Sequence, residues 1–348
     1  MKRWLPTALL LAVIVYLALR PPAGDSEALR RDFPALGTWV SISIYPESAA
    51  QRSAAEQALA TLEQRFHEFE KRWAISGDGA VAQINRALAS GGVAEIPESL
   101  LSGFEQAAQL RRLSGGLFDA RIGALVKLWG FDDASNYRET PPSSPDLQAK
   151  LEALRRAPDW RSGDSYGPAP MVQWDFGAIA KGQLVDESLE FLRDAGLANA
   201  LVNAGGNLKA SGKHGQRNWR IAIRHPRPSD ERRLLATLEP RNEAVITSGD
   251  YERYFEYQGR RYHHILDPRS GQPAQGLQSV TVVAPSAALA DAASTALFVA
   301  GASGWRELAR QMALDTVLVV DGGGQIWATP RAAERLQLAG DQQARILP

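Results

Sequence analysis

The chain contains no cysteine among its 348 residues. This absence excludes disulfide bonds, thiolate nucleophiles, zinc sites built on thiolates and iron–sulfur clusters. It also excludes a lipid-modified N-terminal cysteine as a membrane anchor. The chemistry of the protein, and any attachment to a membrane, must therefore rest on other residues.

Neither sign of charge is in excess. The 39 lysine and arginine residues are balanced by 39 aspartate and glutamate residues, so no basic field favours a nucleic-acid partner. The hydrophobic content of 45% and the charged content of 22% are ordinary for a soluble globular protein. The length allows about two domains of 150 residues or one large domain.

The N-terminus carries an apolar run. Lys2 and Arg3 precede a largely apolar stretch over residues 5–19, which is typical of a secretory signal. The run is short for a spanning helix, which needs about 20 residues. Residues 16–22 make a poor cleavage site, so we favour an uncleaved membrane anchor over a signal that is removed. A buried N-terminal helix is the third and least favoured interpretation. The body is then expected outside the cytoplasmic membrane, and residues 21–32 form a polar linker.

Hydrophobic periodicity predicts mixed helices and strands in the body. An alternating pattern over residues 36–46 predicts a strand, and residues 200–301 are dominated by strands. Residues 132–170, rich in proline, serine and charge, match no pattern well except for one helix that starts at residue 144. The other predicted elements are helices over residues 49–71, 80–88, 97–113 and 291–300, and a hairpin over residues 316–328.

Two adjacent histidines follow a predicted hairpin. Its turn is Gln258-Gly259, and His263 and His264 end the second strand. Because side chains alternate along a strand, at most one of the pair faces a given site. The alternative is a hairpin with an aromatic face and a solvated histidine.

Asp291 and Thr295 lie four residues apart at the start of a predicted helix, so their side chains face the same way. Together with carbonyl groups they would make a hard oxygen site that suits Mg²⁺, an ion that keeps several waters and takes phosphate oxygens. The alternative is that Asp291 caps the helix, which is a common role. These residues alone leave both interpretations open.

Residues 177–182 (GAIAKG) open another predicted helix. Backbone N–H groups at a helix start, with Lys181 beside them, suit a diphosphate, although the spacing is not that of a Walker loop. The alternative is a strand–turn–helix junction with a surface lysine. Asp175 is an acid in an otherwise apolar turn, which invites a hydrogen-bonding ligand. The glycines in residues 203–207 allow close backbone approach, or else mark a bulged strand.

Six segments follow one another in order over residues 33–330. They are LGT (36–38), SGGLFDARIGALVKLWGF (114–131), WDFGAIAKGQLVDE (174–187), ALVNAGGNLKASG (200–212), TSGDYERYFEYQGRRYHHILDPRSG (247–271) and SVTVVAPSAALADAASTALFVAG (279–301). In pattern and order this series resembles the FAD:protein FMN transferases, the ApbE-type flavin transferases. The missing N-terminal cysteine departs from many members of that family, which are lipoproteins.

The resemblance implies an α+β fold: one catalytic unit of two intimately packed α/β lobes over residues 33–340, after a signal or anchor segment and linker over residues 1–32. It implies a metal site of Asp291, Ser294, Thr295 and the Ala178 carbonyl. His264 matches the base of the family's pattern, with His263 as the spare and Asp250 as an orienting group. The expected flavin-adenine contacts are Leu36, Trp73, Leu117, Phe118, Asp119, Asp175, Lys181 and Ile265.

Among these contacts, an aromatic ring such as Trp73 or Phe118 can stack on a flavin or adenine face, and Asp119 can accept a hydrogen bond from the ring or ribose. Phe118 alternatively belongs to the core. SGDG, over residues 76–79, lengthens the stretch after Trp73 compared with the family pattern.

The resemblance implies an enzyme that uses FAD as substrate with Mg²⁺. It would transfer FMN to a threonine or serine hydroxyl of an acceptor protein and release AMP. The acceptor is expected to be a membrane or extracytoplasmic redox subunit, and the enzyme is expected on the periplasmic side of a bacterial inner membrane. Two alternatives remain: a FAD diphosphatase that uses water as nucleophile, and a membrane-tethered flavin-binding accessory protein without turnover.

Overall fold

The structure is a computed structural model that describes residues 27–132, 138–227 and 234–346. The predicted N-terminal anchor lies outside these residues. The first element is strand β1 (Leu29–Ala35), which pairs with β2 (Thr38–Ile44) and begins inside the segment predicted to be a linker. Its polar sequence misled the prediction because β1 is an edge strand whose side chains are mostly exposed.

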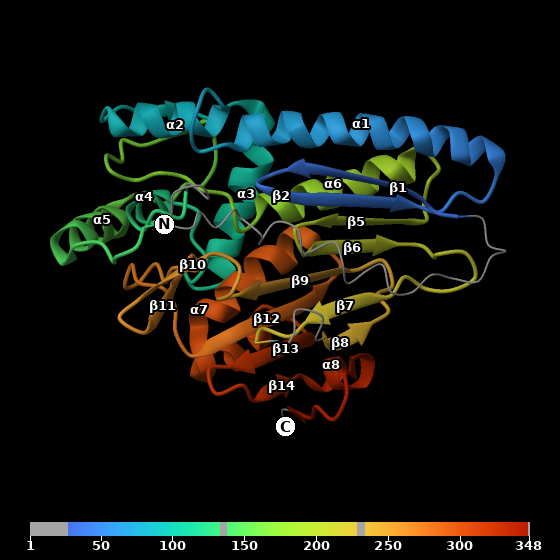
Figure 1. Cartoon of the computed structure of the whole chain (residues 1–348). Helices are drawn as coiled ribbons and strands as arrows, with labels where there is room; N and C mark the ends of the chain where they lie inside the picture. The colour runs from blue at the N-terminus through green and yellow to red at the C-terminus, as the bar shows by residue number, and fades with distance from the viewer. Residues whose placement is uncertain (1–26, 133–137, 228–233, 347–348) are drawn as a thin grey trace, which may run out of the picture.

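Among the described residues, the largest sheet has nine strands in the order β1-β2-β5-β6-β9-β12-β13-β14-β16. Figure 1 shows these strands stacked from β1 and β2 near the top towards β14 near the bottom. Neighbouring strands are antiparallel except β14 and β16, which run parallel. The further strands are β5 (Ala200–Ala204), β6 (Asn207–Ser211), β9 (Ala244–Gly249), β12 (Leu277–Ala284), β13 (Thr316–Asp321), β14 (Ile326–Ala328) and β16 (Ala344–Ile346).

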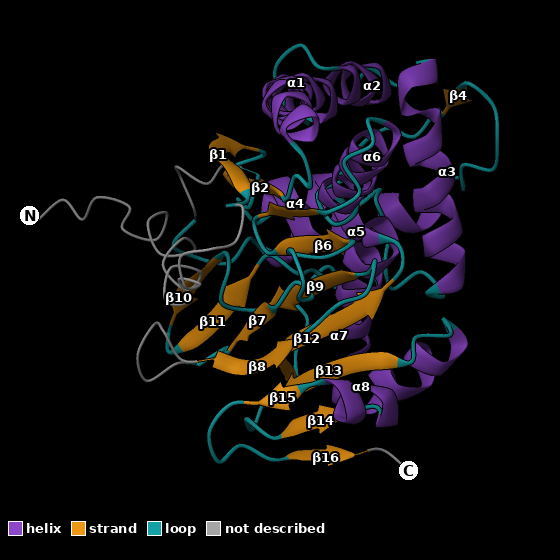
Figure 2. Cartoon of the chain, turned by 90° about the vertical axis from the view of Figure 1, so that its right-hand side faces the viewer, coloured by secondary structure: helices purple, strands orange, loops and turns teal. Residues whose placement is uncertain are grey.

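Helices cover one face of this sheet (Figure 2). They begin with α1 (Ala49–Trp73), whose cap Ser48 accepts a hydrogen bond from the Gln51 N–H and whose apolar stripe, including Leu62 and Phe66, enters the core. The next helices are α2 (Ala80–Ala89), α3 (Glu98–Leu113), α4 (Gly123–Leu128), α5 (Ser144–Arg156), α6 (Ala180–Asp194) and α7 (Ala287–Gln311). Helix α8 (Pro330–Arg335) instead packs on the opposite face, where Ala332 contacts the same cluster as Leu318. Helices α6 and α7 pack directly on the central strands.

A second core lies on the opposite face. It is built around Trp219, Ile221 and Leu235 and includes residues of the large sheet such as Leu318. A small sheet supplies much of it, in the order β15-β8-β7, with β7 (Ile221–Arg224), β8 (Leu234–Leu238) and β15 (Gln337–Leu338). Strand β12 is buried at every position because both faces of the sheet are covered there.

A third cluster joins α4 and α5 to a hairpin of β10 (Tyr254–Tyr257) and β11 (Arg260–His263). The predicted turn is confirmed, because Gln258 and Gly259 both have positive φ, of 50° and 74°. A pair of short strands, β3 (Ala94–Glu95) and β4 (Ser165–Tyr166), completes the described elements. The α+β fold is as predicted, and the helix at residue 144 is α5.

Candidate active site at the crossing of two helices

Helix α7 carries three oxygen-bearing side chains near its start. Asp291, Ser294 and Thr295 are spaced by three and four residues, which places them on one side of a helix. Asp291 and Ser294 are buried, with 4% and 0% of their surface exposed, whereas Thr295 is partly exposed. The helix therefore presents a hard oxygen face that is sealed on one side and accessible on the other.

Asp291 is not the cap of this helix, so that alternative is wrong. The helix begins at Ala287, and the hydroxyl of Ser286 accepts a hydrogen bond from the Leu289 N–H at 3.2 Å. Serine and aspartate are both favoured caps, so local sequence did not decide between them. Tertiary contacts decide, because Asp186 of α6 accepts hydrogen bonds from the N–H groups of Ala287 and its neighbour Ala288.

Asp291 faces the start of α6. Its Oδ2 accepts a hydrogen bond from the Gly182 N–H at 3.1 Å. Burial raises the pKa of Asp291, and the Lys181 ammonium, the Gly182 N–H and the Asn207 amide oppose this rise only in part. A buried carboxylate with so little compensation is suited to a cationic ligand.

The helices can approach this closely because residue 182 is glycine. A Cβ there would lie 2.4 Å from the carbonyl oxygen of Ala287 and 2.8 Å from the Cα of Ala288. Both are backbone atoms, so any side chain would push α6 and α7 apart.

Strand β9 adds a hydroxyl to the site. Ser248 Oγ lies 2.8 Å from Ser294 Oγ and 3.3 Å from Thr295 Oγ1. Ser294 also donates to the carbonyl of Asp291 at 2.9 Å. Ser248 belongs to the TSGDY segment but was not among the predicted site residues, because strand pairing alone brings it beside α7.

Asn207 is the second residue that sequence analysis left out. It is 4% exposed, and among the described residues its Nδ2 has no hydrogen-bond partner within normal limits, although the amide lies close enough to lower the pKa of Asp291. A buried donor without a partner is costly unless a ligand supplies an acceptor. The bulged-strand alternative for residues 203–207 is wrong, because β5 and β6 pair in register around a turn at Gly205 and Gly206 with φ of 61° and 94°.

The loop before α6 is shaped by its own side chains. Asp175 Oδ1 accepts a hydrogen bond from the Gly177 N–H at 2.7 Å, which tightens the turn. Lys181 Nζ donates to the Gly177 carbonyl at 2.8 Å, and Ala178 is half-buried beside it. The predicted helix start is confirmed at Ala180, and it has no side-chain cap among the described contacts.

The two histidines have different environments. His263 is buried, its Nε2 lies 2.8 Å from the Ala274 carbonyl, and its Nδ1 accepts from the Ile265 N–H at 3.3 Å. A carbonyl can only accept, so Nε2 carries the proton and both nitrogens are engaged. Burial lowers the pKa of His263, and the hydrogen bond to Ala274 opposes this only in part.

Only one ring nitrogen of His264, Nδ1, takes part in the described hydrogen bonds. Its Nδ1 lies 3.3 Å from the Arg253 carbonyl, so Nδ1 carries the proton and Nε2 holds a lone pair. The ring is only partly exposed, and desolvation, with the charge of Arg253, lowers its pKa well below the usual range. Lys181 acts on the pKa of both His264 and Asp291, which links the histidine to the helix crossing.

Asp250 is engaged by arginines. Its two oxygens accept from Arg227 at 2.7 and 2.5 Å, and Arg261 lies 3.8 Å away. Asp250 also contributes electrostatically to the pKa of His263. The described contacts thus tie Asp250 to Arg227 on a loop and to Arg261 on strand β11, and its predicted role in orienting His264 stays a prediction.

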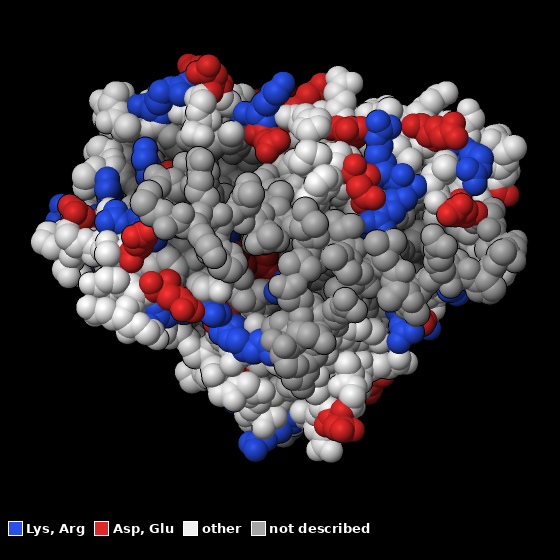
Figure 3. Space-filling model, viewed as in Figure 1, with Lys and Arg blue, Asp and Glu red and all other residues white. Residues whose placement is uncertain are grey.

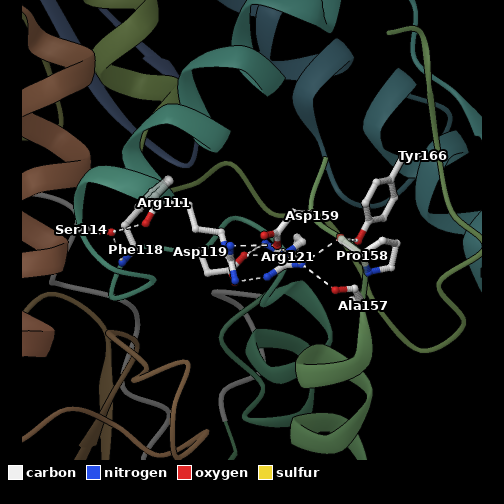
Figure 4. Close-up of polar contacts among 9 residues, drawn as sticks. All are labelled: Arg111, Ser114, Phe118, Asp119, Arg121, Ala157, Pro158, Asp159 and Tyr166. Carbon is white, nitrogen blue, oxygen red and sulfur yellow. Dashed lines mark hydrogen bonds and ion pairs between the residues drawn. The ribbon is translucent and has the colours of Figure 1, made fainter. Parts of the chain in front are cut away.

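Asp119 lies at the centre of an ion-pair cluster (Figure 4). Arg121 donates to its two oxygens at 2.9 and 2.7 Å, and Arg111 donates at 2.8 Å. Burial would raise the pKa of Asp119, but the hydrogen bonds and charge of Arg121, assisted by Arg111, hold it below its usual value. Both oxygens of Asp119 are therefore engaged by arginines, and its predicted contact with the ring or ribose stays a prediction.

The two predicted aromatic contacts lie in the core. The Trp73 ring stacks on Phe69 at a centroid distance of 5.1 Å and meets the edge of Phe176 at 4.9 Å. Phe118 is 3% exposed, which favours the core alternative. Gly103 is needed here, because a Cβ would lie 2.0 Å from the Trp73 ring.

The remaining predicted contacts lie at the edges of the core. Leu36 occupies the β1–β2 turn with φ of 56°, an uncommon conformation for leucine. Leu117 is partly buried, and Ile265 is buried with its carbonyl bonded to the Ala274 N–H at 2.9 Å. Their roles as ligand contacts stay predictions.

The described part of the face seen in Figure 3 shows no field of one sign. In Figure 3, the lysine and arginine side chains on the visible described surface are interspersed with aspartate and glutamate. Helix α7 is long and apolar enough to pass as a membrane span by composition, but 61% of its most apolar window is buried inside the protein. We therefore treat it as the core helix that carries the site.

The fold and the site define a class of protein: an α+β sheet protein in which a buried face of acid and hydroxyl groups lies where two helices cross. Residues 36–318 match the model of the ApbE family, and the chain belongs to that family. The chain is 37% identical over 345 residues to a FAD:protein FMN transferase of Rhodobacter capsulatus, covering 95% of this chain but only 63% of that relative. It is also 37% identical over 291 residues to a FAD:protein FMN transferase of Treponema pallidum, covering 76% and 77% of the two chains.

Solved structures agree with this assignment. The crystal structure of the ApbE protein of Thermotoga maritima superposes with a TM-score of 0.77 at 31% identity, covering 89% of this chain and 99% of that one. A Pseudomonas stutzeri flavinyl transferase ApbE in its apo form superposes with a TM-score of 0.76 at 30% identity, covering 90% and 98%. The predicted family and fold class are therefore confirmed.

Proposed function

We propose that this protein transfers FMN from FAD to a threonine or serine hydroxyl of an acceptor protein and releases AMP. The observation that carries the proposal is the α6–α7 crossing, where Asp291, Ser294 and Thr295 face the Lys181 region. A diphosphate needs cationic partners and N–H donors on one side and a hard cation on the other. The names of the relatives support the same reaction.

The residues present suit Mg²⁺. Among the described residues, no group of three or more His, Asp or Glu side chains could hold a metal. Mg²⁺ does not require such a group, because it keeps several waters and is often held by one or two carboxylates plus substrate phosphates. Asp291 and Thr295, with Ser294 beside them and the Ala178 carbonyl, would hold the ion. When bound, it would neutralise charge on the diphosphate and the leaving AMP.

The chain's own groups supply the other functions. Lys181, the start of α6 and the Asn207 amide would bind diphosphate oxygens. His264 would accept the proton of the attacking hydroxyl at Nε2, the nitrogen that holds a lone pair. A bond then forms between the acceptor oxygen and the FMN phosphorus, and the bond from that phosphorus to the AMP oxygen breaks. Positioning and charge neutralisation supply most of the rate enhancement in such a transfer.

We also propose that the enzyme acts on the periplasmic side of a bacterial inner membrane, held by its N-terminal segment. The charged start and the apolar run over residues 5–19 support this. The acceptor would then be a membrane or extracytoplasmic redox subunit. Protease treatment of spheroplasts tests the location: degradation of the body in intact spheroplasts supports it, and protection until lysis contradicts it.

The reaction is tested with the full chain in detergent, FAD and Mg²⁺, with and without an acceptor domain. An acceptor heavier by one FMN, together with stoichiometric AMP and dependence on Mg²⁺, establishes the transferase. Free FMN and AMP without labelled acceptor would instead show a FAD diphosphatase. Bound but intact FAD would show an accessory protein.

A further inference from the structure

Asp186 of helix α6 joins three parts of the molecule. Its Oδ1 accepts hydrogen bonds from Lys209 Nζ of β6 at 2.6 Å and from the Ala287 N–H at 3.0 Å. Its Oδ2 accepts from Ser286 Oγ at 2.9 Å and from the Ala288 N–H at 3.1 Å. One carboxylate thus holds the first N–H groups of α7, the cap residue of α7 and a lysine of the central sheet.

The contact that Asp186 makes with α7 mirrors the contact that Asp291 makes with α6. Gly182 and Asp186 lie one turn apart on α6, and Ala287 and Asp291 lie one turn apart on α7. Asp186 binds the N–H of Ala287, while Asp291 binds the N–H of Gly182. The two helices are therefore joined by a pair of reciprocal hydrogen bonds, each from a carboxylate on one helix to a backbone N–H on the other.

Capping of α7 does not by itself account for a partly buried charge at position 186. The cap Ser286 already satisfies the N–H of Leu289, so α7 has a side-chain cap without Asp186. Asp186 instead brings a charge that is only 21% exposed and pairs it with Lys209, which is 18% exposed. A paired, partly buried charge at a helix start fixes the direction and distance of the helix more strongly than a hydroxyl does.

We propose that Asp186, paired with Lys209, is a positioning residue that sets the register of α7 against α6. It would thereby place Asp291 and Thr295 opposite Lys181. This inference rests on the proposed function, because it assigns a purpose to that register. Misplacement of reacting groups by about 1 Å can cost about a hundredfold in rate.

The test compares Asp186→Asn with Asp321→Asn in the full chain. Asp321 is a matched control, because it accepts hydrogen bonds from the N–H groups of Gly323 and Gln325 and from Trp327 Nε1, in the β13–β14 turn. Each substitution keeps the size of the side chain and removes one charge. The readouts are melting temperature, the Mg²⁺ concentration for half-maximal FMN transfer, and Mn²⁺ affinity measured by electron paramagnetic resonance with AMP present.

We expect Asp186→Asn to raise the half-saturating Mg²⁺ concentration and the Mn²⁺ dissociation constant about tenfold or more, whereas Asp321→Asn lowers only the melting temperature. Lys209→Met should give a smaller shift in the same direction, and it serves as the test if Asp186→Asn does not fold. Unchanged metal affinity in the folded variants, or an equal change in Asp321→Asn, would overturn the inference. If the wild type shows no Mg²⁺-dependent transfer, the proposed function fails, and the Mn²⁺ measurement still decides the role of Asp186.

Discussion

Asp119 and Asp291 are both buried acids, yet their surroundings are opposite. Asp119 receives three guanidinium hydrogen bonds, and its pKa lies below the usual range. Asp291 receives one backbone N–H within normal hydrogen-bond limits, and its pKa is raised. The two aspartates are similarly buried, but the carboxylate of Asp119 is paired with arginines, whereas that of Asp291 is largely uncompensated.

The difference separates an acid engaged in ion pairs from an acid that has few compensating partners. A buried carboxylate paired with arginines cannot lose one partner without a large cost in stability. A carboxylate buried beside hydroxyls, a lysine and an unpartnered amide costs stability unless a ligand occupies the site. The resemblance placed Asp119 among the flavin-adenine contacts and Asp291 in the metal site, and it did not indicate how either carboxyl is compensated.

The largest effect is expected for Asp291→Asn. The amide oxygen can still accept from Gly182, but the charge that would hold a cation is lost, so transfer should fall about a thousandfold or more. The melting temperature should not fall, because the buried charge is removed without creating a cavity. Transfer is measured as flavin fluorescence of the acceptor. Activity within tenfold of wild type would contradict the role of the Asp291 charge in holding a cation.

Asp119→Ala should act on stability instead. Removing one partner of a buried ion pair costs about 3–5 kcal/mol, so the free energy of unfolding in urea should fall by that amount. The control is Asp159→Ala, whose side chain is 53% exposed and whose loss should cost at most about 1 kcal/mol.

The pH dependence of Asp119 follows from its lowered pKa. The carboxylate should stabilise the protein above the ordinary pKa of about 3.9, and this contribution should be lost as pH falls through the lower folded value. Equal urea midpoints for wild type and Asp119→Ala at neutral pH would show that the ion-pair cluster contributes nothing.

The smallest of the three effects is expected for His264→Ala. A base with a lowered pKa is weak, so its loss should cost about a hundredfold, the low end for general base catalysis. FAD binding, measured by fluorescence quenching, should persist.

The pH profile tests the same assignment. The wild-type rate should stay level around neutrality and fall only in acid, below the ordinary histidine value of about 6.5, as His264 becomes protonated. The variant should lose this acid limb. Unchanged transfer after His264→Ala would exclude it as the base.

The sequence predicted most elements because their signals are local. The α1 stripe, the Gln258-Gly259 turn and the β13–β14 hairpin each depend on residues close together in the chain. Edge strand β1 was missed because most of its residues are exposed, and its sequence shows no regular alternation of apolar and polar residues. The start of α7 was misplaced because Ser286 and Asp291 are equally good caps by type.

By itself, the sequence determined the family, the fold class and the hard oxygen face of Asp291, Ser294 and Thr295, since spacing on one helix suffices for the last. Only the tertiary structure decided which partners surround each buried acid. It paired Asp119 with two arginines and held Trp73 in the core. It also brought Asn207 and Gly182 beside Asp291, and Ser248 beside Ser294. These contacts join residues far apart in the chain, and the satisfaction of a buried polar group depends on such neighbours rather than on its sequence context.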